Sequence, residues 1–230
     1  MSPWLRAVGA VLRKDLLLEW RSREALTSMA FFALLVTVLF GFSFDAGRVD
    51  RDIMAETLGP GLLWIAFSFS GVLGLNRSFA LEREGGCLQA LMLAPVDRSA
   101  VFAGKMLGNL LLIGLVEVLT LPVFSILMRV SVLSCLPRLA LVAFLGTLGF
   151  SAVGTLLSAL ASGSRLREVL LPLLLYPVWV PVLIAATQLT GQALGGRPAA
   201  EGERWLALIA AYDLVFITAG LLLFDHLLEE

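Results

Sequence analysis

The chain has few of the residues from which most active sites are built. Its 230 residues include one histidine, two cysteines and two tyrosines, and 15% of them are charged. The single histidine, His226, lies at one end of the last apolar run, remote from any nucleophile or carboxylate that could complete a catalytic set. The sequence also contains no G-x-x-x-x-G-K-[ST] loop to hold nucleotide phosphates. We therefore expect no catalytic residues and no ATP site in this chain.

Apolar residues are present in excess. The sequence is 59% hydrophobic, with a mean hydropathy of +0.91, whereas ordinary soluble domains are about 45–50% apolar. A helix needs roughly 20 apolar residues to cross the hydrocarbon core of a membrane. Six runs reach that length, at residues 25–44, 61–79, 101–128, 133–161, 168–189 and 205–227. The sequence therefore predicts an all-α membrane protein with a transmembrane domain of six helices over residues 25–227.

Proline and glycine interrupt two of these runs. The fifth contains three prolines, Pro172, Pro177 and Pro181. They predict a bend in that helix or a break into half-helices. The fourth contains three glycines, Gly146, Gly149 and Gly154, which predict either a kink or close helix packing. A further pair, Gly104 and Gly108, predicts a packing face at the start of the third run rather than a phosphate cradle.

Basic residues are divided unequally between the loops. Eleven of the seventeen fall in the N-terminal segment and in the second and fourth loop regions, and six fall in the other loops. The positive-inside rule then places the N-terminus in the cytoplasm, and six crossings return the C-terminus to the same side. Charges recur through residues 6–24, so we expect no cleavable signal there. Cys87 and Cys135 fall on opposite sides of the membrane and cannot form a disulfide with each other.

Residues 1–24 predict an amphipathic helix that lies on the membrane surface. At 100° per residue, most apolar side chains between residues 4 and 18 share one half of the helix and the basic ones share the other. Asp15 interrupts the apolar half and needs water or a protein neighbour, and Glu19 is expected to pair with Arg23. Either the helix only anchors the first span, or it is an elbow that also contacts a cytoplasmic partner. The candidate residues of this segment are Arg13, Lys14, Asp15 and Glu19.

A charged segment, residues 81–99, separates the second and third runs. Two glycines allow a sharp turn, a short apolar stretch repeats at helical spacing, and a proline ends it. Asp97 or Ser99 can cap the following helix. We predict a short helix across the cytoplasmic surface whose exposed apolar side binds a partner protein; the alternative is that it lies on lipid. The candidate residues are Glu82, Arg83, Glu84, Leu88, Leu91, Pro95, Asp97 and Arg98.

Four polar residues lie inside or at the ends of the apolar runs. Glu117 and Asp213 fall within spans, where an ionised side chain costs about 2.5–3.5 kcal/mol, so each is expected to face protein or a wet cavity. They serve either as a gate or partner contact, or as hydrogen-bonded packing residues. Asn76 and Arg77 precede the charged segment, and we expect them to fix the second span relative to it.

These segments resemble a known family. The stretch LEREGGCLQALMLAPVDR after the second of six spans resembles the coupling helix of ABC-2-type exporter permeases, and KDLLLEWRSRE resembles their N-terminal elbow helix. Five further stretches make the whole chain similar to the CcmB family, the permeases of cytochrome c maturation. In order, these are LNRSFALERE, LAPVDRSAVFAGKMLGNLL, LGTLGFSAVGTLLSALA, REVLLPLLLYPVWVPVL and LLFDHLLEE.

The resemblance implies a bacterial inner-membrane subunit that forms a homodimer and works with a separate ATPase, CcmA. It further implies association with the heme-handling membrane protein CcmC, the small membrane protein CcmD and the heme chaperone CcmE, with no nucleic acid partner. ATP and magnesium would bind the ATPase, and the residues of segment 81–99 would contact it. A generic ABC-2 exporter of lipid, polysaccharide or drug, and a passive membrane scaffold, are the alternatives.

The sequence argues against a heme held directly by this chain. Protein-bound heme iron usually takes histidine, methionine, cysteine or tyrosine as its axial ligand. The outer loops contain no histidine, and His226 is expected at the cytoplasmic interface. Met128 and Cys135, near the outer face, are the remaining weak candidates. We expect heme to be bound by the partner proteins, and this chain to act mechanically.

Overall fold

The protein is all-helical in the part of the chain that the structure describes. The structure is a computed structural model that describes residues 2–44, 49–84, 97–161, 164 and 166–227. The elements are α1 (Pro3–Ser22), α2 (Glu24–Ser43), α3 (Arg51–Ile53), the π-helical turn η1 (Met54–Leu58), α4 (Gly59–Glu84), α6 (Arg98–Leu127), η2 (Leu133–Cys135), α7 (Leu136–Ala161), α8 (Arg167–Leu194), η3 (Ala199–Gly202) and α9 (Glu203–Leu227).

Six helical segments are long and apolar enough to cross a membrane, as the sequence predicts. In chain order, these segments contain α2, α4, α6, α7, α8 and α9. Several helices extend beyond the predicted runs, and α4 continues to Glu84. The third span begins at Arg98, before the first residue of its apolar run, and the fifth continues to Leu194.

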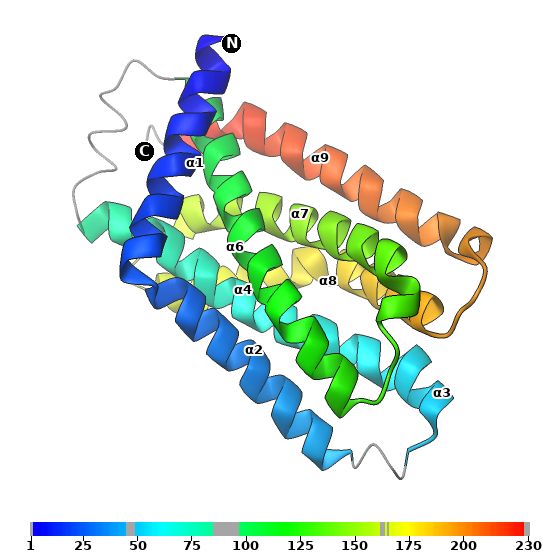
Figure 1. Cartoon of the computed structure of the whole chain (residues 1–230). Helices are drawn as coiled ribbons and strands as arrows, with labels where there is room; N and C mark the ends of the chain where they lie inside the picture. Colours follow the sequence, from blue (N-terminus) through cyan, green and yellow to red (C-terminus); the bar gives the residue numbers. More distant parts are fainter. Residues whose placement is uncertain (1, 45–48, 85–96, 162–163, 165, 228–230) are drawn as a thin grey trace.

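The first helix is arranged differently from the others. In Figure 1 the six spans run side by side, and α1 lies across one end of the bundle, beside the start of α6 and near the C-terminus. We call this the elbow end. The connections from α6 to α7 and from α8 to α9 lie at the opposite end (Figure 1). The two chain ends therefore share one end of the bundle, as the predicted topology requires.

The centre of the bundle is formed by α4 and α7. Their spans are 61% and 67% buried, against 17–33% for the other four. Aromatic side chains fill the space between α4, α7 and α8: the rings of Phe150 and Trp179 lie 4.8 Å apart, and those of Trp64 and Trp179 6.1 Å apart. The indole Nε1 of Trp64 donates to the hydroxyl of Thr190 at 2.9 Å. The buried indole thus keeps a partner, and its ring packs into the core.

Glycines let α7 approach its neighbours closely. A Cβ added at Gly146 would lie 2.4 Å from Cη2 of Trp64, and one at Gly154 would lie 2.3 Å from Cδ1 of Leu75. Of the two alternatives for these glycines, a kink or close packing, these contacts support close packing. α8 is continuous through its three prolines, and the alternative of two half-helices is wrong.

The Gly146→Ala substitution is expected to destabilise the bundle by about 1–3 kcal/mol, because the new methyl group would overpack α7 against Trp64. Thermal unfolding of the detergent-purified protein measures the change. The matched control is Gly114→Ala on α6, since nothing lies within 4 Å of a Cβ at that position, and alanine there gains helix propensity. Equal midpoints for the two variants would contradict the packing argument.

Candidate functional site at the elbow end

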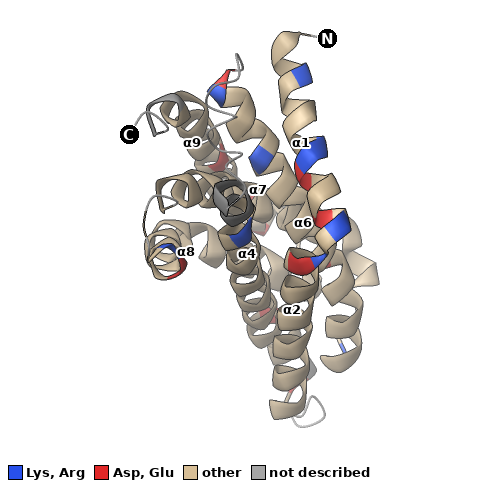
Figure 2. Cartoon of the chain, turned by 90° about the vertical axis from the view of Figure 1, so that its left-hand side faces the viewer, with Lys and Arg blue, Asp and Glu red and all other residues tan. Residues whose placement is uncertain are grey.

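Charged side chains gather at the elbow end of the bundle. Figure 2 shows this end facing the viewer, with basic and acidic positions along α1 and around the neighbouring starts and ends of α2, α4 and α6. The last turn of α4 contains Glu82, Arg83 and Glu84, and α6 begins at Arg98. The two helices that flank residues 85–96 thus both reach the elbow end, where α6 packs against α1.

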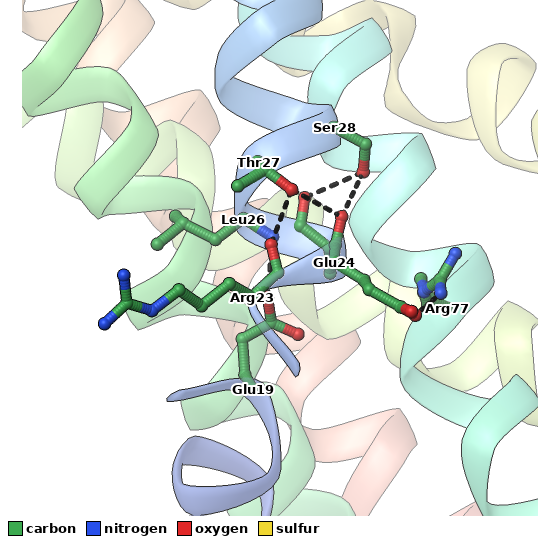
Figure 3. A network of polar contacts seen from close by, with 8 residues as sticks. Glu19, Arg23, Glu24, Leu26, Thr27, Ser28 and Arg77 are labelled. Carbon is green, nitrogen blue, oxygen red and sulfur yellow. Dashed lines mark hydrogen bonds and ion pairs between the residues drawn. The ribbon is translucent and has the colours of Figure 1, made fainter. Parts of the chain in front are cut away.

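The corner between α1 and α2 is made by a single residue. Arg23 separates the two helices in the left-handed conformation, with φ 54° and ψ 12°, and its backbone N–H donates to the carbonyl oxygen of Glu19 at 2.7 Å. The buried carboxylate of Glu19 accepts the backbone N–H of Leu26 at 2.7 Å (Figure 3). This contact caps the first turn of α2, where a negative charge is favourable.

The expected pairing of Glu19 with Arg23 is therefore wrong. The guanidinium of Arg23 lies 5.6 Å from the centroid of the Trp20 ring instead, a distance typical of a cation–π contact. Because a left-handed residue ends α1 at this point, the regular four-residue spacing on which the pairing depends no longer applies.

An ion pair between Arg77 and Glu24 joins α4 to the first turn of α2 (Figure 3). Arg77 was expected to fix the second span, and the structure shows the first span as its partner. Both side chains are about half exposed, so the pair contributes little to stability, of the order of 0–1 kcal/mol. Asn76, its neighbour, lies half-buried on α4.

Lys105 is one of the eleven basic residues that the sequence assigns to the N-terminal segment and to the second and fourth loop regions, but it lies inside α6, with 1% of its surface exposed. Its Nζ lies 3.4 Å from Oδ2 of Asp15 on α1 and donates to the backbone carbonyl of Ser78 on α4 at 3.2 Å. Lys105 thus contacts both neighbouring helices. It is also the protein neighbour that Asp15 needs; Lys14 is a second, 3.1 Å away.

The Gly104 and Gly108 face packs against α1, which confirms the predicted packing face. A Cβ at Gly104 would lie 2.7 Å from Cβ of Val11 and 3.1 Å from the carbonyl oxygen of Val8. Trp4 adds a second attachment, because its Nε1 donates to the hydroxyl of Ser99 at 2.9 Å. The small-xxx-small spacing of Gly104 and Gly108 is the signal that marked this packing face in the sequence.

Asp97 caps α6 as predicted: its carboxylate accepts the backbone N–H of Ser99 at 2.9 Å. The predicted coupling helix, however, lies outside the described residues, and so do Cys87, Leu88, Leu91 and Pro95. The structure describes both of its flanks, the end of α4 and the cap of α6. His226 lies in the last turn of α9, at the elbow end.

A small cleft of about 40 Å³ opens between α1, α2, α4 and α6 beside these contacts. Its polar lining consists of Asp15, Glu19, Arg77, Ser78 and Asn109. Within the described ranges, no group of three or more histidine, cysteine or carboxylate side chains could hold a metal ion. The polar contacts around this cleft hold the helices relative to one another.

Both intramembrane carboxyl groups face protein, as predicted. Glu117 is 4% exposed and accepts a hydrogen bond from the hydroxyl of Thr147 on α7. Asp213 is also 4% exposed and packs against Gly149 of α7, where a Cβ would lie 2.3 Å from its Oδ1. Neither oxygen of Asp213 has a hydrogen-bond partner among the described residues. The two carboxyl groups therefore differ in their environment.

A hydrogen bond from Asn109 to Thr155, 3.0 Å long and buried, connects α6 to α7 closer to the elbow end. A double-mutant cycle with Asn109→Leu and Thr155→Val is expected to give a coupling of about 0.6 kcal/mol, and at most ~1.7 kcal/mol. Thermal unfolding in detergent provides the four stabilities. The control cycle pairs Asn109→Leu with Thr120→Val, because the hydroxyl of Thr120 bonds the carbonyl of Val116 in its own helix and not Asn109. Equal coupling in both cycles would refute an interhelical contribution.

Comparison with known proteins gives the same family for the whole chain. A family model described as CcmB protein matches residues 6–228. The heme exporter protein B of Pseudomonas aeruginosa is 31% identical over 213 residues, which cover 91% of this chain and 93% of that protein. The proteins of the same name from Rhodobacter capsulatus and Paracoccus denitrificans are 34% and 32% identical, over 90% and 89% of this chain and 93% and 92% of theirs. The chain belongs to the CcmB family.

Proposed function

We propose that this chain is the membrane permease subunit of an ABC transporter for heme export in cytochrome c maturation, and that it couples ATP hydrolysis by a separate subunit to rearrangement of the heme-handling complex. Its family is named for heme export, and its six spans suit a permease. The proposed partners are a CcmA-like ATPase, a second copy of this chain, CcmC-like and CcmD-like membrane proteins and a CcmE-like heme chaperone.

The observation that supports this role most directly is the arrangement of the elbow end. The end of α4, the start of α6 and the helix α1 all lie at this end of the bundle. Polar contacts join α6 to α1 through Trp4 and Asp15, and Lys105 of α6 also bonds Ser78 of α4. A partner that binds residues 85–96 from the cytoplasm would displace α4 and α6 together. Since those helices pack against the central α7, the displacement would reach the opposite end of the bundle.

The proposal gives each part of the complex a separate task. ATP and magnesium bind the ATPase, heme binds the partner proteins, and this chain transmits movement without a reactive group of its own. The protein lies in a bacterial inner membrane in this proposal, with the elbow end facing the cytoplasm. A passive scaffold would need no ATPase, so its presence or absence in the isolated native complex separates the two roles.

The Glu82→Arg/Glu84→Arg double variant is expected to reduce the ATPase activity of the purified complex and to stop cytochrome c maturation. The reversed charges would repel a basic contact surface, and like charges in an interface are unfavourable. Phosphate release and the heme-stained cytochrome c of intact cells measure the two effects. The control is Glu201→Arg at the opposite end, in the exposed turn η3. Unchanged turnover and maturation in the double variant would show that these carboxylates do not contact the ATPase.

A further inference from the structure

Lys105 is an unusual residue to find in the core of a membrane bundle. Its side chain is 1% exposed, and it lies in the second turn of α6 between two glycines that bring α1 close. A buried cation loses its hydration, and replacing a buried ion pair with apolar side chains is often neutral or stabilising. Stability alone therefore does not account for a lysine here.

The contacts of Lys105 join three helices at a single atom. Nζ lies 3.4 Å from Oδ2 of Asp15 on α1 and 3.2 Å from the carbonyl oxygen of Ser78 on α4. Ser78 lies six residues before the end of α4, and Lys105 lies seven residues after the start of α6. The ammonium group thus connects both helices that flank residues 85–96 to the elbow helix.

A buried ion pair also fixes geometry in a way that apolar contacts do not. The ammonium group has to keep its acceptors when the helices move, because breaking a buried ion pair leaves an uncompensated charge in the bundle and is strongly destabilising. The apolar contacts of α1 with Gly104 and Gly108, in contrast, could slide along α6. The pair therefore favours a movement in which α1, α4 and α6 shift together.

We propose that Lys105 is a positioning residue that makes α1 move with α4 and α6, so that the elbow helix is part of the moving unit rather than a fixed anchor in the membrane surface. This inference rests on the proposed function, since it assumes that ATP turnover displaces residues 85–96. The sequence leaves two roles open for α1, a membrane anchor for the first span or an elbow that also contacts a cytoplasmic partner. The inference favours the elbow.

Distances between nitroxide labels in the whole complex test the inference. With Cys87 and Cys135 replaced by alanine, one label is placed at the exposed position Ala10 on α1 or Leu111 on α6, and the reference label at the exposed Leu222 on α9. In the native sequence we expect both distances to change when ATP is added. In Lys105→Met we expect the change at Leu111 to remain and the change at Ala10 to be lost.

Three further variants separate positioning from folding. Asp15→Asn removes the charge near the membrane surface and is expected to give the same selective loss if Lys105→Met does not fold. The swap Asp15→Lys/Lys105→Asp restores the ion pair between α1 and α6 and is expected to restore the change at Ala10. Arg6→Gln removes an exposed cation from α1 and is expected to leave both changes intact.

The outcomes distinguish this inference from the proposed function. If ATP changes neither distance in the native sequence, the proposed coupling of ATP hydrolysis to helix movement fails, and the role of Lys105 fails with it. If both distances change in the native sequence and also in Lys105→Met and Asp15→Asn, the coupling remains and only the role of Lys105 is overturned.

Discussion

Glu117→Lys is expected to remove most of the folded protein from the membrane. The side chain lies near the middle of α6 and is buried against α7, where its carboxyl group accepts the hydroxyl hydrogen of Thr147. An ammonium group there would have no carboxylate to pair with at that position, and a lysine at the centre of a span costs about 2.5–3.5 kcal/mol to insert. Fluorescence-detected size-exclusion chromatography of a tagged protein measures the folded fraction.

The matched control for this prediction is Glu117→Gln. The amide keeps an oxygen that can accept from Thr147, so we expect a folded fraction close to that of the native sequence. Cytochrome c maturation in the same cells then decides what the carboxyl group does. A folded glutamine variant that supports maturation assigns Glu117 to packing, whereas a folded variant that fails assigns it to a gate or partner contact. A well-folded Glu117→Lys variant would contradict the burial of this side chain.

Asp213→Val is expected to change stability in the opposite direction, raising the free energy of unfolding by about 1–3 kcal/mol. Neither carboxyl oxygen of Asp213 has a hydrogen-bond partner among the described residues, and an unpaired buried polar group costs that amount. Valine is close in volume and presents only carbon to Gly149. Thermal and denaturant unfolding in detergent both measure the gain.

Asp213→Asn is the control here, because it keeps two unpaired polar atoms at the same position and is expected to show no gain. Equal stability of the valine variant and the native sequence would mean that the carboxyl group has a partner in the assembled protein. A valine variant that is more stable but fails in maturation would show that Asp213 serves function at a cost in stability, a common property of functional sites.

Hydropathy was sufficient to predict the number and order of the spans, because a run of apolar residues long enough to cross a membrane has few other uses. Local signals were also reliable: Asp97 caps α6, and the glycines at 104 and 108 form a packing face. The family resemblance was confirmed over nearly the whole chain.

The contacts between helices were not predictable from the same patterns. A helical wheel shows which side of α1 is apolar, but it does not show that this side packs against α6 or that Lys105 lies buried there. The positive-inside rule treats basic residues near the end of a span as loop residues, and Lys105 was assigned to a loop for that reason. Glu19 was expected to pair with Arg23 and Arg77 to fix the second span relative to the charged segment. Glu19 instead caps α2 at Leu26, and Arg77 pairs with Glu24 at the start of α2.

The pairing of Asp15 with Lys105 has a consequence for the biogenesis of the protein. The two residues are 90 positions apart, and a ribosome adds about 5–20 residues per second, so the nascent N-terminal helix exists for roughly 5–18 s before its partner is synthesised. During that interval the hydrogen bonds around Arg23 hold the helix against the first span. Release of the third span from the translocon then supplies the cation, so the earliest helix to be made is joined to its ion-pair partner only after half of the six spans exist.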